Sequence, residues 1–253
     1  MMSHYLIKTG ASSIILGKGH YGNFINVKQG KLLKITNIND NHNEMKYHKQ
    51  IRKINHYMKY YVIPDEEEYI LDPNDNFYKK LKELLLKYHL DTTILNSSLH
   101  YYYVDYAGNK DLLDTLNDIE VNSKVCYWNS YSKILKLIKS ILHGLKYLHD
   151  NKIAHLDIKP ENIMINTTLN QYRIIDFGFS SQEPFTDFVK DVRGTPGYFP
   201  KYYPDEPINE WLPRIHANDT ILDNGYIPFI KNYRLIYKID SYCLGTCPIL
   251  LKI

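Results

Sequence analysis

The residues between positions 155 and 162 have the side chains that the transfer of a phosphoryl group requires. The segment reads HLDIKPEN and contains Asp157, Lys159 and Asn162, and Asp176 follows it in the triplet DFG. Phosphoryl transfer needs a carboxylate that orients the attacking hydroxyl and accepts its proton, cations near the phosphates, and ligands for Mg²⁺. Mg²⁺ is a hard cation that prefers carboxylate and amide oxygens. The four side chains together supply this set.

A run of glycines near the N-terminus is a second candidate for phosphate binding. It reads GKGHYG and contains Gly17, Gly19 and Gly22. Without a Cβ atom, glycine lets backbone N–H groups come close to phosphate oxygens. Such a run is a weak signal when it stands alone. Here two predicted strands flank it and the polar segments follow it, so the pattern favours a phosphate-binding loop.

The elements around the glycines predict a strand-rich N-terminal part. Residues 12–35 alternate in polarity and contain β-branched residues, which is typical of short antiparallel strands. Residues 41–60 place apolar side chains at helical spacing and predict a helix. Residues 61–71 predict a strand with an acidic bend. The segments NDNFYKKLKELLLKYHL and LHYYYVDY then predict a helix and an aromatic strand.

The middle of the chain contains the clearest amphipathic helix, at residues 130–150. Its predicted apolar face consists of Ile134, Leu135, Ile138, Ile141, Leu142, Leu145 and Leu148. The segments NIMIN and YRIID follow as two short strands joined by a polar turn. A strand-rich first third and a helical middle predict an α+β protein with two lobes.

Composition excludes several classes of function. The chain has 253 residues and a formal net charge of +3 without a long Lys/Arg block, so we expect no nucleic-acid partner. The chain has three cysteines, Cys126, Cys243 and Cys247, and no two of them form a CxxC pair. We therefore expect free thiols in a reducing compartment. The N-terminus lacks an apolar signal region, and no apolar run reaches about 18 residues. We therefore expect a cytoplasmic or nuclear protein without a membrane partner.

These motifs make the chain similar to eukaryotic-type protein kinases over nearly its whole length. HLDIKPEN resembles the catalytic loop of that family, DFG its metal-binding turn and GKGHYG its glycine-rich loop. The resemblance implies a bilobal kinase domain over residues 1–253, with an N-lobe at 12–105 and a partial C-lobe at 106–253. It implies transfer of the γ-phosphate of ATP to Ser or Thr hydroxyls of protein substrates, with Mg²⁺ as cofactor.

The resemblance also implies roles for the polar segments. Asp157 and Lys159 match the catalytic residues of the family, and Asn162 and Asp176 match its metal ligands. The segment GTPGY at 194–198 resembles the end of the activation segment, and together with Lys159 it favours Ser/Thr over Tyr acceptors.

Further positions match the family's ATP contacts. Lys34 matches the lysine that contacts the α- and β-phosphates, and Glu44 is the carboxylate that could pair with it. A solvated strand lysine and a helix-surface carboxylate are the alternative interpretations. Asp105 and Ala107 match the hinge that meets adenine through its backbone. Asp111 matches a ribose-contacting acid, and it equally matches the N-cap of a following helix.

Some positions depart from the family pattern. Leu32 and Phe24 replace smaller residues and predict a crowded adenine roof. Lys34 and Glu44 are unusually close in sequence, and His48 stands where an apolar residue is expected, so both features weaken the assignment of Glu44. The Glu of the APE motif is missing at 201–202.

A further departure concerns regulation. Leu156 replaces the Arg of the HRD motif and cannot make a charge-assisted hydrogen bond to a phosphorylated residue. We therefore expect activity to be independent of phosphorylation at Ser180, Ser181 or Thr186 through this route.

The segment DSYCLG from Asp240 resembles the start of the central C-lobe helix, whose Asp braces the catalytic loop. A long insertion precedes it. Another insertion is expected at 72–98. This second insertion and the amino-acid composition resemble those of kinases from large DNA viruses. Pro248 should end or kink the helix, and the chain stops soon after it. These features predict a truncated C-lobe of marginal stability, with a stabilising partner or self-association.

Two other functions remain open. One is a catalytically weak or dead kinase-like binding module, and the presence of the whole phosphotransfer set argues against it. The other is a small-molecule kinase of the same fold, and the GTPGY segment argues for a protein substrate instead.

Overall fold

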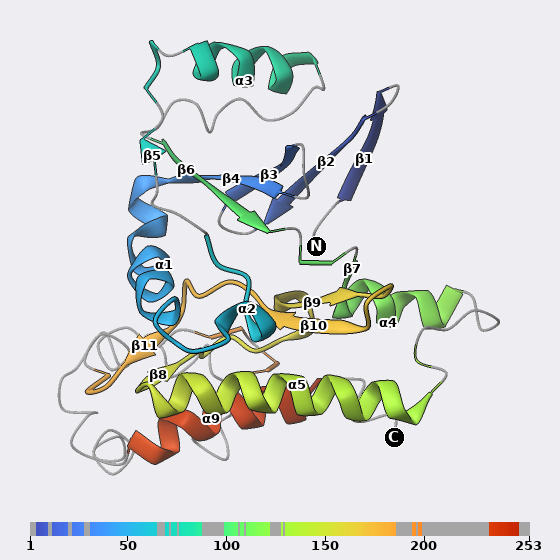
Figure 1. Ribbon diagram of the computed structural model, residues 1–253, viewed down its shortest axis with the longest axis vertical. Helices are drawn as coiled ribbons and strands as arrows, with labels where there is room; N and C mark the ends of the chain where they lie inside the picture. Colours follow the sequence, from blue (N-terminus) through green and yellow to red (C-terminus); the bar gives the residue numbers. More distant parts are fainter. Residues whose placement is uncertain are drawn as a thin grey trace. The chain divides into compact units, whose positions relative to one another are not determined.

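A computed structural model describes most of the chain (Figure 1). The described residues are 4–9, 12–19, 22–27, 31–64, 69–70, 72–74, 76–87, 99–105, 107–108, 110–121, 128, 130–185, 194–195, 197–198 and 233–247. The chain divides into two compact units. Unit 1 consists of Met1–Lys49 and Val62–Tyr106, and unit 2 of Gln50–Tyr61 and Ala107–Ile253.

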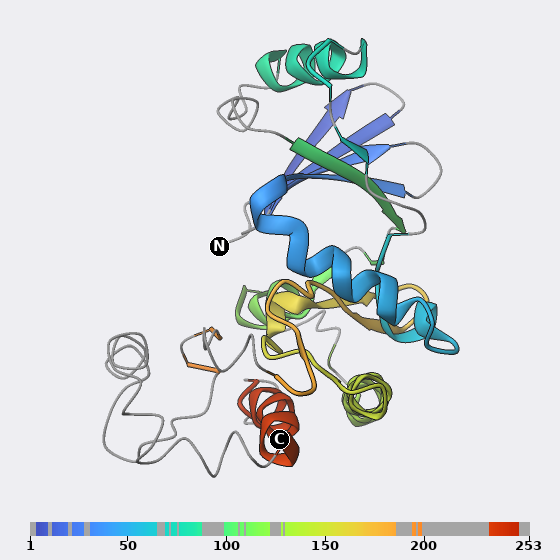
Figure 2. The ribbon, with the colours of Figure 1, turned by 90° about the vertical axis from the view of Figure 1, so that its left-hand side faces the viewer.

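Unit 1 is built on a six-stranded antiparallel sheet in the order β1-β2-β3-β4-β6-β5 (Figures 1 and 2). Its strands are β1 His4–Thr9, β2 Ser12–Gly19, β3 Gly22–Val27, β4 Lys31–Asn37, β5 Tyr69–Ile70 and β6 Leu99–Asp105. The sequence predicted β2, β3, β4 and β6 but not β1. The register pairs Gly19 with Gly22 at the β2–β3 turn and Lys34 with Tyr102 across β4 and β6.

The helix predicted at 41–60 has the wrong bounds. The structure has α1 Ile38–Ile51, then turns, then the short α2 Tyr57–Tyr60. His56, directly before α2, has a φ of 61° in the left-handed region. A residue in that conformation cannot continue a right-handed helix, although the apolar spacing runs on through it. In the predicted strand at 61–71, the structure has single bridges at Tyr61 and Pro64 and the short strand β5.

The other elements of unit 1 follow the pattern of the sequence more closely. The predicted charged helix is α3 Asn76–Lys87. Helix α1 packs through Met45 against Tyr102 and Val104 of β6, and Val62 adds a partly buried apolar contact. Burial of these side chains fixes α1 to the sheet, and it thereby brings the first turns of α1 next to β4.

Unit 2 is mainly helical and contains two small sheets. Its long helices are α4 Leu112–Val121, α5 Tyr131–Asp150 and α9 Tyr233–Gly245. Its strands are β7 Lys110–Asp111, β8 Ile153–Ala154, β9 Ile163–Asn166, β10 Gln171–Ile174 and β11 Ser181–Gln182. The predicted hairpin is β9–β10, which β7 extends, and β8 pairs with β11. Figure 2 looks along α5 and shows α9 beside it, and the two helices are in contact.

The apolar face predicted for α5 is only partly right. Leu137, Ile141, Gly144, Leu145 and Leu148 are buried, whereas Leu135 and Leu142 are exposed. Gly144 explains part of the shift, because a Cβ there would lie 3.1 Å from Ile174 Cδ1 and 3.4 Å from the side chains of Tyr60 and Tyr61. Helix α5 therefore comes close to α2 and β10 on the side that contains Gly144.

Helix α9 also differs from the prediction, since it begins at Tyr233 and has Asp240 in its interior. Asp240 was expected at its start because DSYCLG resembles the family motif that begins this helix. Pro248, Lys201 and Tyr202 lie outside the described residues. The insertion was expected between Tyr202 and Asp240; its residues 203–232 also lie outside the described part, and its last residues belong to α9. Among the helices that the structure describes, none is both long and apolar enough to span a membrane.

Candidate active site

The backbone of residues 155–157 is held by a buried carboxylate from α9. Asp240 is fully buried, and its Oδ2 accepts a hydrogen bond from the backbone N–H of His155 at 2.9 Å. Its Oδ1 accepts one from the N–H of Leu156 at 2.7 Å. His149 Nε2, from the end of α5, lies 2.8 Å from the same Oδ2. Charged acceptors make strong hydrogen bonds to backbone donors, so Asp240 fixes the path of the loop.

The loop takes a strained conformation at the braced residue. Leu156 has a φ of 66°, a left-handed conformation that is uncommon for a residue with a branched side chain. Its side chain is fully buried. The two-N–H brace from Asp240 explains how this conformation persists, because the surrounding contacts compensate for the local strain.

His155 and Phe177 support the loop from inside unit 2. His155 is fully buried, its Nε2 lies 3.1 Å from the carbonyl oxygen of Ile175, and its ring meets Phe177 edge-on at 5.1 Å. Phe177 in turn meets the ring of Tyr61 edge-on at 5.9 Å. The HLD and DFG segments are thus packed together as one assembly.

The carboxylate of Asp157 lies at the centre of a polar cluster. Its Oδ2 accepts a hydrogen bond from Asn162 Nδ2 at 2.9 Å and lies 2.8 Å from Lys159 Nζ. Its Oδ1 accepts a hydrogen bond from the hydroxyl of Thr195, and Lys159 Nζ donates to that hydroxyl at 2.8 Å. Asn162 Nδ2 also donates to the backbone carbonyl of Asp157 at 2.9 Å.

The side chains of this cluster differ in their exposure to solvent. Asp157 and Asn162 are buried, while Lys159 and Thr195 are partly exposed. A carboxylate held by an ammonium, an amide and a hydroxyl has a fixed orientation, which is what a group that positions an attacking hydroxyl requires.

Asn162 and Asp176 have the donor atoms that a Mg²⁺ ion prefers. Asn162 uses its nitrogen for hydrogen bonds to Asp157, which leaves its amide oxygen as the metal-binding atom. Asp176 has a φ of 64° and is partly exposed, and its Oδ1 accepts from the N–H of Gly178 at 3.2 Å.

Among the residues that the structure describes, no group of three or more His, Cys, Asp or Glu side chains could hold a metal ion by itself. Proteins usually bind Mg²⁺ through one or two carboxylates together with phosphate oxygens. The donor set of Asn162 and Asp176 therefore fits Mg²⁺ bound with a nucleotide.

Unit 1 contains the second candidate group, the pair of Lys34 and Glu44. Lys34 Nζ lies 2.8 Å from Oε1 and 2.6 Å from Oε2 of Glu44, and both side chains are buried. The hydroxyl of Tyr102 donates to Glu44 Oε2 at 3.3 Å. His48 Nε2, one turn along α1, lies 3.5 Å from Oε1, and its Nδ1 lies 3.4 Å from Met45 Sδ. The pair predicted from the sequence is therefore formed, despite the short spacing and despite His48.

The remaining predicted positions are found as follows. Gly17 and Gly19 lie in β2 and Gly22 begins β3. Asp105 ends β6, and Ala107 is buried just after it. Asp111 Oδ1 accepts from the N–H of Asp114 at 2.7 Å, which is an N-cap contact for α4, so the capping interpretation is correct. This contact does not test the predicted ribose role.

Several residues that complete these groups were not predicted from the sequence. Tyr102 reaches Glu44 from another strand, and His149 reaches Asp240 from another helix. Neither contact follows a local spacing rule. Gly108 is a further case, because a Cβ there would lie 2.2 Å from the carbonyl oxygen of Ile165. Only glycine allows this approach of the segment after β6 to β9.

Comparisons with known proteins agree with this geometry. The protein kinase domain profile matches residues 12–202. The striated muscle preferentially expressed protein kinase of Danio rerio is 47% identical over 74 residues, which are 29% of this chain and 2% of that protein. The serine/threonine-protein kinase dkf-1 of Caenorhabditis elegans is 46% identical over 67 residues, 25% of this chain and 9% of that protein.

The chain thus spans only a small part of these curated relatives. Among solved structures, the kinase PK-1 of the Cydia pomonella granulovirus has a TM-score of 0.44 at 19% identity, over 78% of this chain and 58% of that chain. The family profile covers most of the sequence, including every polar segment described above from Lys34 to Thr195. The chain therefore belongs to the eukaryotic-type protein kinase family.

Proposed function

We propose that the chain transfers the γ-phosphate of ATP to Ser or Thr hydroxyls of protein substrates, with Mg²⁺. The observation that supports it most is the Asp157 cluster. A buried carboxylate is oriented there by Lys159, Asn162 and Thr195 on a loop that Asp240 braces. Family membership supports the reaction class.

In this proposal Asp157 accepts the hydrogen bond of the substrate hydroxyl and takes its proton as the oxygen attacks the γ-phosphorus. The bond between that phosphorus and the bridging oxygen of ADP breaks, and ADP leaves. Lys159 lies close enough to Asp157 to place a positive charge beside the transferred group. Its present contact with Thr195 would then be exchanged for a contact with phosphate.

Asn162 and Asp176 would hold Mg²⁺ through their side-chain oxygens. The bound ion would neutralise negative charge that develops on the phosphates. In unit 1, Lys34 would contact the α- and β-phosphates, and Glu44 would keep its ammonium in place through the bidentate contact. Residues 17–22 would cover the phosphates, and the backbone of Asp105 and Ala107 would meet the adenine.

The preference for Ser and Thr rests on Lys159 and Thr195. These side chains contact each other, and both contact Asp157. The named relative from Caenorhabditis elegans is a serine/threonine-protein kinase, which supports the same preference. We keep the division into lobes at 12–105 and 106–253 as part of this proposal.

The test is phosphotransfer from radiolabelled ATP by the purified chain. A generic basic protein, a tyrosine-containing polymer and a panel of small hydroxyl compounds serve as separate acceptors. The proposal expects label on Ser or Thr of the protein acceptor, and only with Mg²⁺ present. Label on a small compound alone would indicate a small-molecule kinase, and no label on any acceptor would indicate a binding module.

A further inference from the structure

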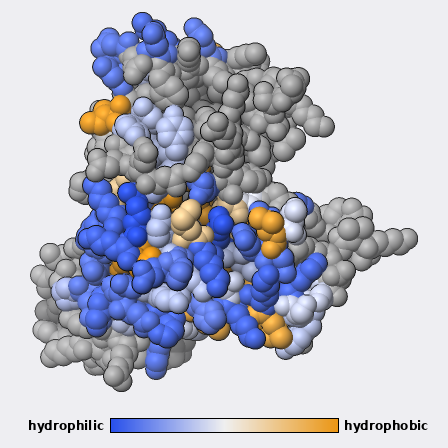
Figure 3. Space-filling view, in the orientation of Figure 1, coloured by the Kyte–Doolittle hydropathy of each residue, from blue (hydrophilic) through white to orange (hydrophobic). Residues whose placement is uncertain are grey.

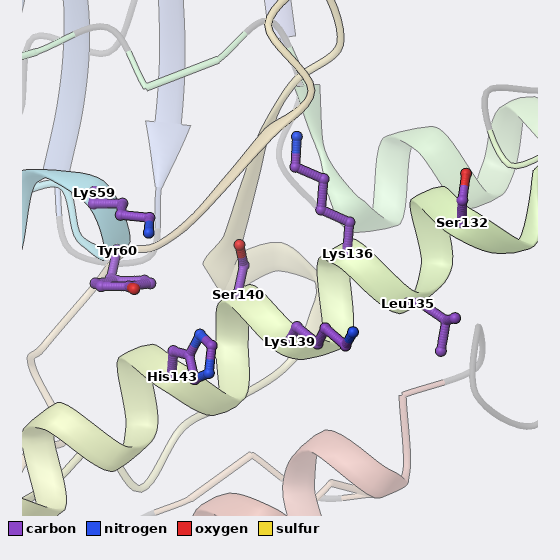
Figure 4. Close-up of a pocket in the computed structure, with 8 residues that line it drawn as sticks. All are labelled: Lys59, Tyr60, Ser132, Leu135, Lys136, Lys139, Ser140 and His143. Atoms are coloured by element: carbon purple, nitrogen blue, oxygen red, sulfur yellow. The ribbon is translucent and has the colours of Figure 1, made fainter.

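A pocket on unit 2 lies apart from the residues assigned to phosphotransfer. It is formed between α2 and one side of α5 and has a volume of about 420 Å³ (Figure 4). Lys59 and Tyr60 line it from α2, and Ser132, Lys136, Lys139 and His143 line it from α5. The residues from α5 recur at intervals of three or four, so they form one stripe along the helix.

The stripe is the solvent side of α5. The opposite side of the helix buries Leu137, Ile141 and Leu145, which fixes the orientation of the stripe. Gly144 allows α2 to come close to α5, and the Tyr61 hydroxyl donates to the Gly144 carbonyl oxygen at 2.5 Å. The pocket wall is therefore attached to the core of unit 2 rather than to a loop.

The cations of the pocket have no carboxylate partners in the part of the chain that the structure describes. Lys136 and Lys139 make no ion pair there, and Lys59 only lies over the ring of Tyr60, at 5.1 Å from its centre. Another lysine of the same helix behaves differently, since Lys146 pairs with Asp150 at 2.5 Å. An unbalanced group of lysines lowers the free energy of a bound anion.

The arrangement of the ammonium groups suggests the shape of that anion. Figure 4 shows the side chains of Lys59, Lys136 and Lys139 spread along the pocket rather than directed at one point. At about 1.5 Å per helical residue, the stripe from Ser132 to His143 is about 16 Å long. An extended peptide covers this length with about five residues at about 3.3 Å each. A single compact phosphate would contact only part of the row.

We propose that this pocket binds an acidic segment of a protein partner in an extended conformation. Carboxylates of the segment would pair with Lys136, Lys139 and Lys59, and an apolar side chain of the segment would rest on Leu135, which lines the same pocket and is exposed. Tyr60 is buried, and its ring contacts those of His143 and Tyr147, so it supports the pocket from the side of α2. Figure 3 shows a mostly hydrophilic surface over this part of unit 2, which suits a reversible polar interaction.

The test is fluorescence anisotropy of a labelled, glutamate-rich peptide with one central leucine, titrated with the full chain. The double variant Lys136→Gln/Lys139→Gln should raise the Kd about tenfold, because two ion pairs are lost. Both lysines are exposed, so the variant should fold normally. Lys146→Gln is the matched control and should leave the Kd unchanged.

Three outcomes would overturn the proposal. The first is no binding of the peptide by the full chain, and the second is an equal loss of affinity in the Lys146→Gln control. The third is stronger competition by inorganic phosphate or by a single-stranded oligonucleotide than by unlabelled peptide, which would indicate a compact-anion or nucleic-acid site. The measurement needs no phosphotransfer, so its result is independent of the function proposed above.

Discussion

The Asp157 cluster in unit 2 and the Lys34–Glu44 pair in unit 1 both place a buried carboxylate beside a lysine, but they hold it differently. Asp157 receives two of its partners, Lys159 and Asn162, from its own segment of the chain. Glu44 receives Lys34 from β4 and the hydroxyl of Tyr102 from β6. The first group is thus mainly local in sequence, whereas the second depends on the packing of α1 on the sheet.

Asp240 is a third buried carboxylate. Among the residues that the structure describes no lysine contacts it, and it instead accepts hydrogen bonds from the N–H groups of His155 and Leu156 and lies 2.8 Å from His149 Nε2. The Asp157 cluster therefore still depends on a distant residue, Asp240, which acts on the backbone of its segment. Loss of that residue should affect unit 2 far more than loss of Glu44 affects unit 1.

The largest effect is expected for Asp240→Ala. The change leaves two buried backbone N–H groups without their acceptor, so the free energy of unfolding should fall by about 3–5 kcal/mol. Chemical denaturation of the full chain measures it, with the exposed neighbour Ser241→Ala as control. Equal stability of the two variants would show that Asp240 does not brace the loop.

An alkaline titration tests the burial of Cys247, which lies two residues after the end of α9. Burial raises the pKa of the Cys247 thiol to about 12 from 9.0, with a smaller contribution from the Glu161 carboxylate. The unfolded chain forms its thiolate from pH 9, so this contribution to stability is complete below pH 9 and is lost as the pH rises toward 12.

The expected loss is about 1.4 kcal/mol for each pH unit in this window. Cys247→Ala should make the dependence of unfolding free energy on pH shallower than in the wild type. Parallel curves for the two proteins would mean that the thiol is accessible to water.

For unit 1, a double-mutant cycle measures the coupling of Lys34 and Glu44. Lys34→Met and Glu44→Gln should each lower phosphotransfer, and the double variant should lose less than the sum, with a coupling of about 0.5–3 kcal/mol. The bidentate contact is the physical reason. Strict additivity would show that the contact does not serve the reaction.

The smallest effect is expected for dephosphorylation. Leu156 offers no cation to a phosphate, and Ser180 and Ser181 are buried. Phosphatase treatment followed by its removal should therefore leave phosphotransfer unchanged. Loss of activity, with recovery after rephosphorylation, would contradict this interpretation.

Much of the fold could be predicted from the sequence where short-range patterns decide it. The strands β2, β3 and β4, the helix α5 and the β9–β10 hairpin follow from alternation and from helical spacing. The α+β fold class is confirmed by the family match. Two partners in the Asp157 cluster, Lys159 and Asn162, follow from one short segment because they are its neighbours in sequence, whereas the contact with Thr195 does not.

The rest depends on tertiary contacts that spacing does not encode. The buried face of α5 depends on what packs against Gly144. The contact of Tyr102 with Glu44 depends on the register of β6 beside β4. In each case the deciding partner is a residue from another element.

The most direct test of the central claim compares ATP binding and phosphotransfer in the variant Asp157→Asn. Asn keeps the shape of the side chain and removes its charge, so the loop held by Asp240 should be preserved. The account predicts that turnover falls about 10²–10⁴-fold while ATP affinity stays near that of the wild type. Wild-type turnover in this variant would contradict the assignment of Asp157 and with it the proposed reaction centre.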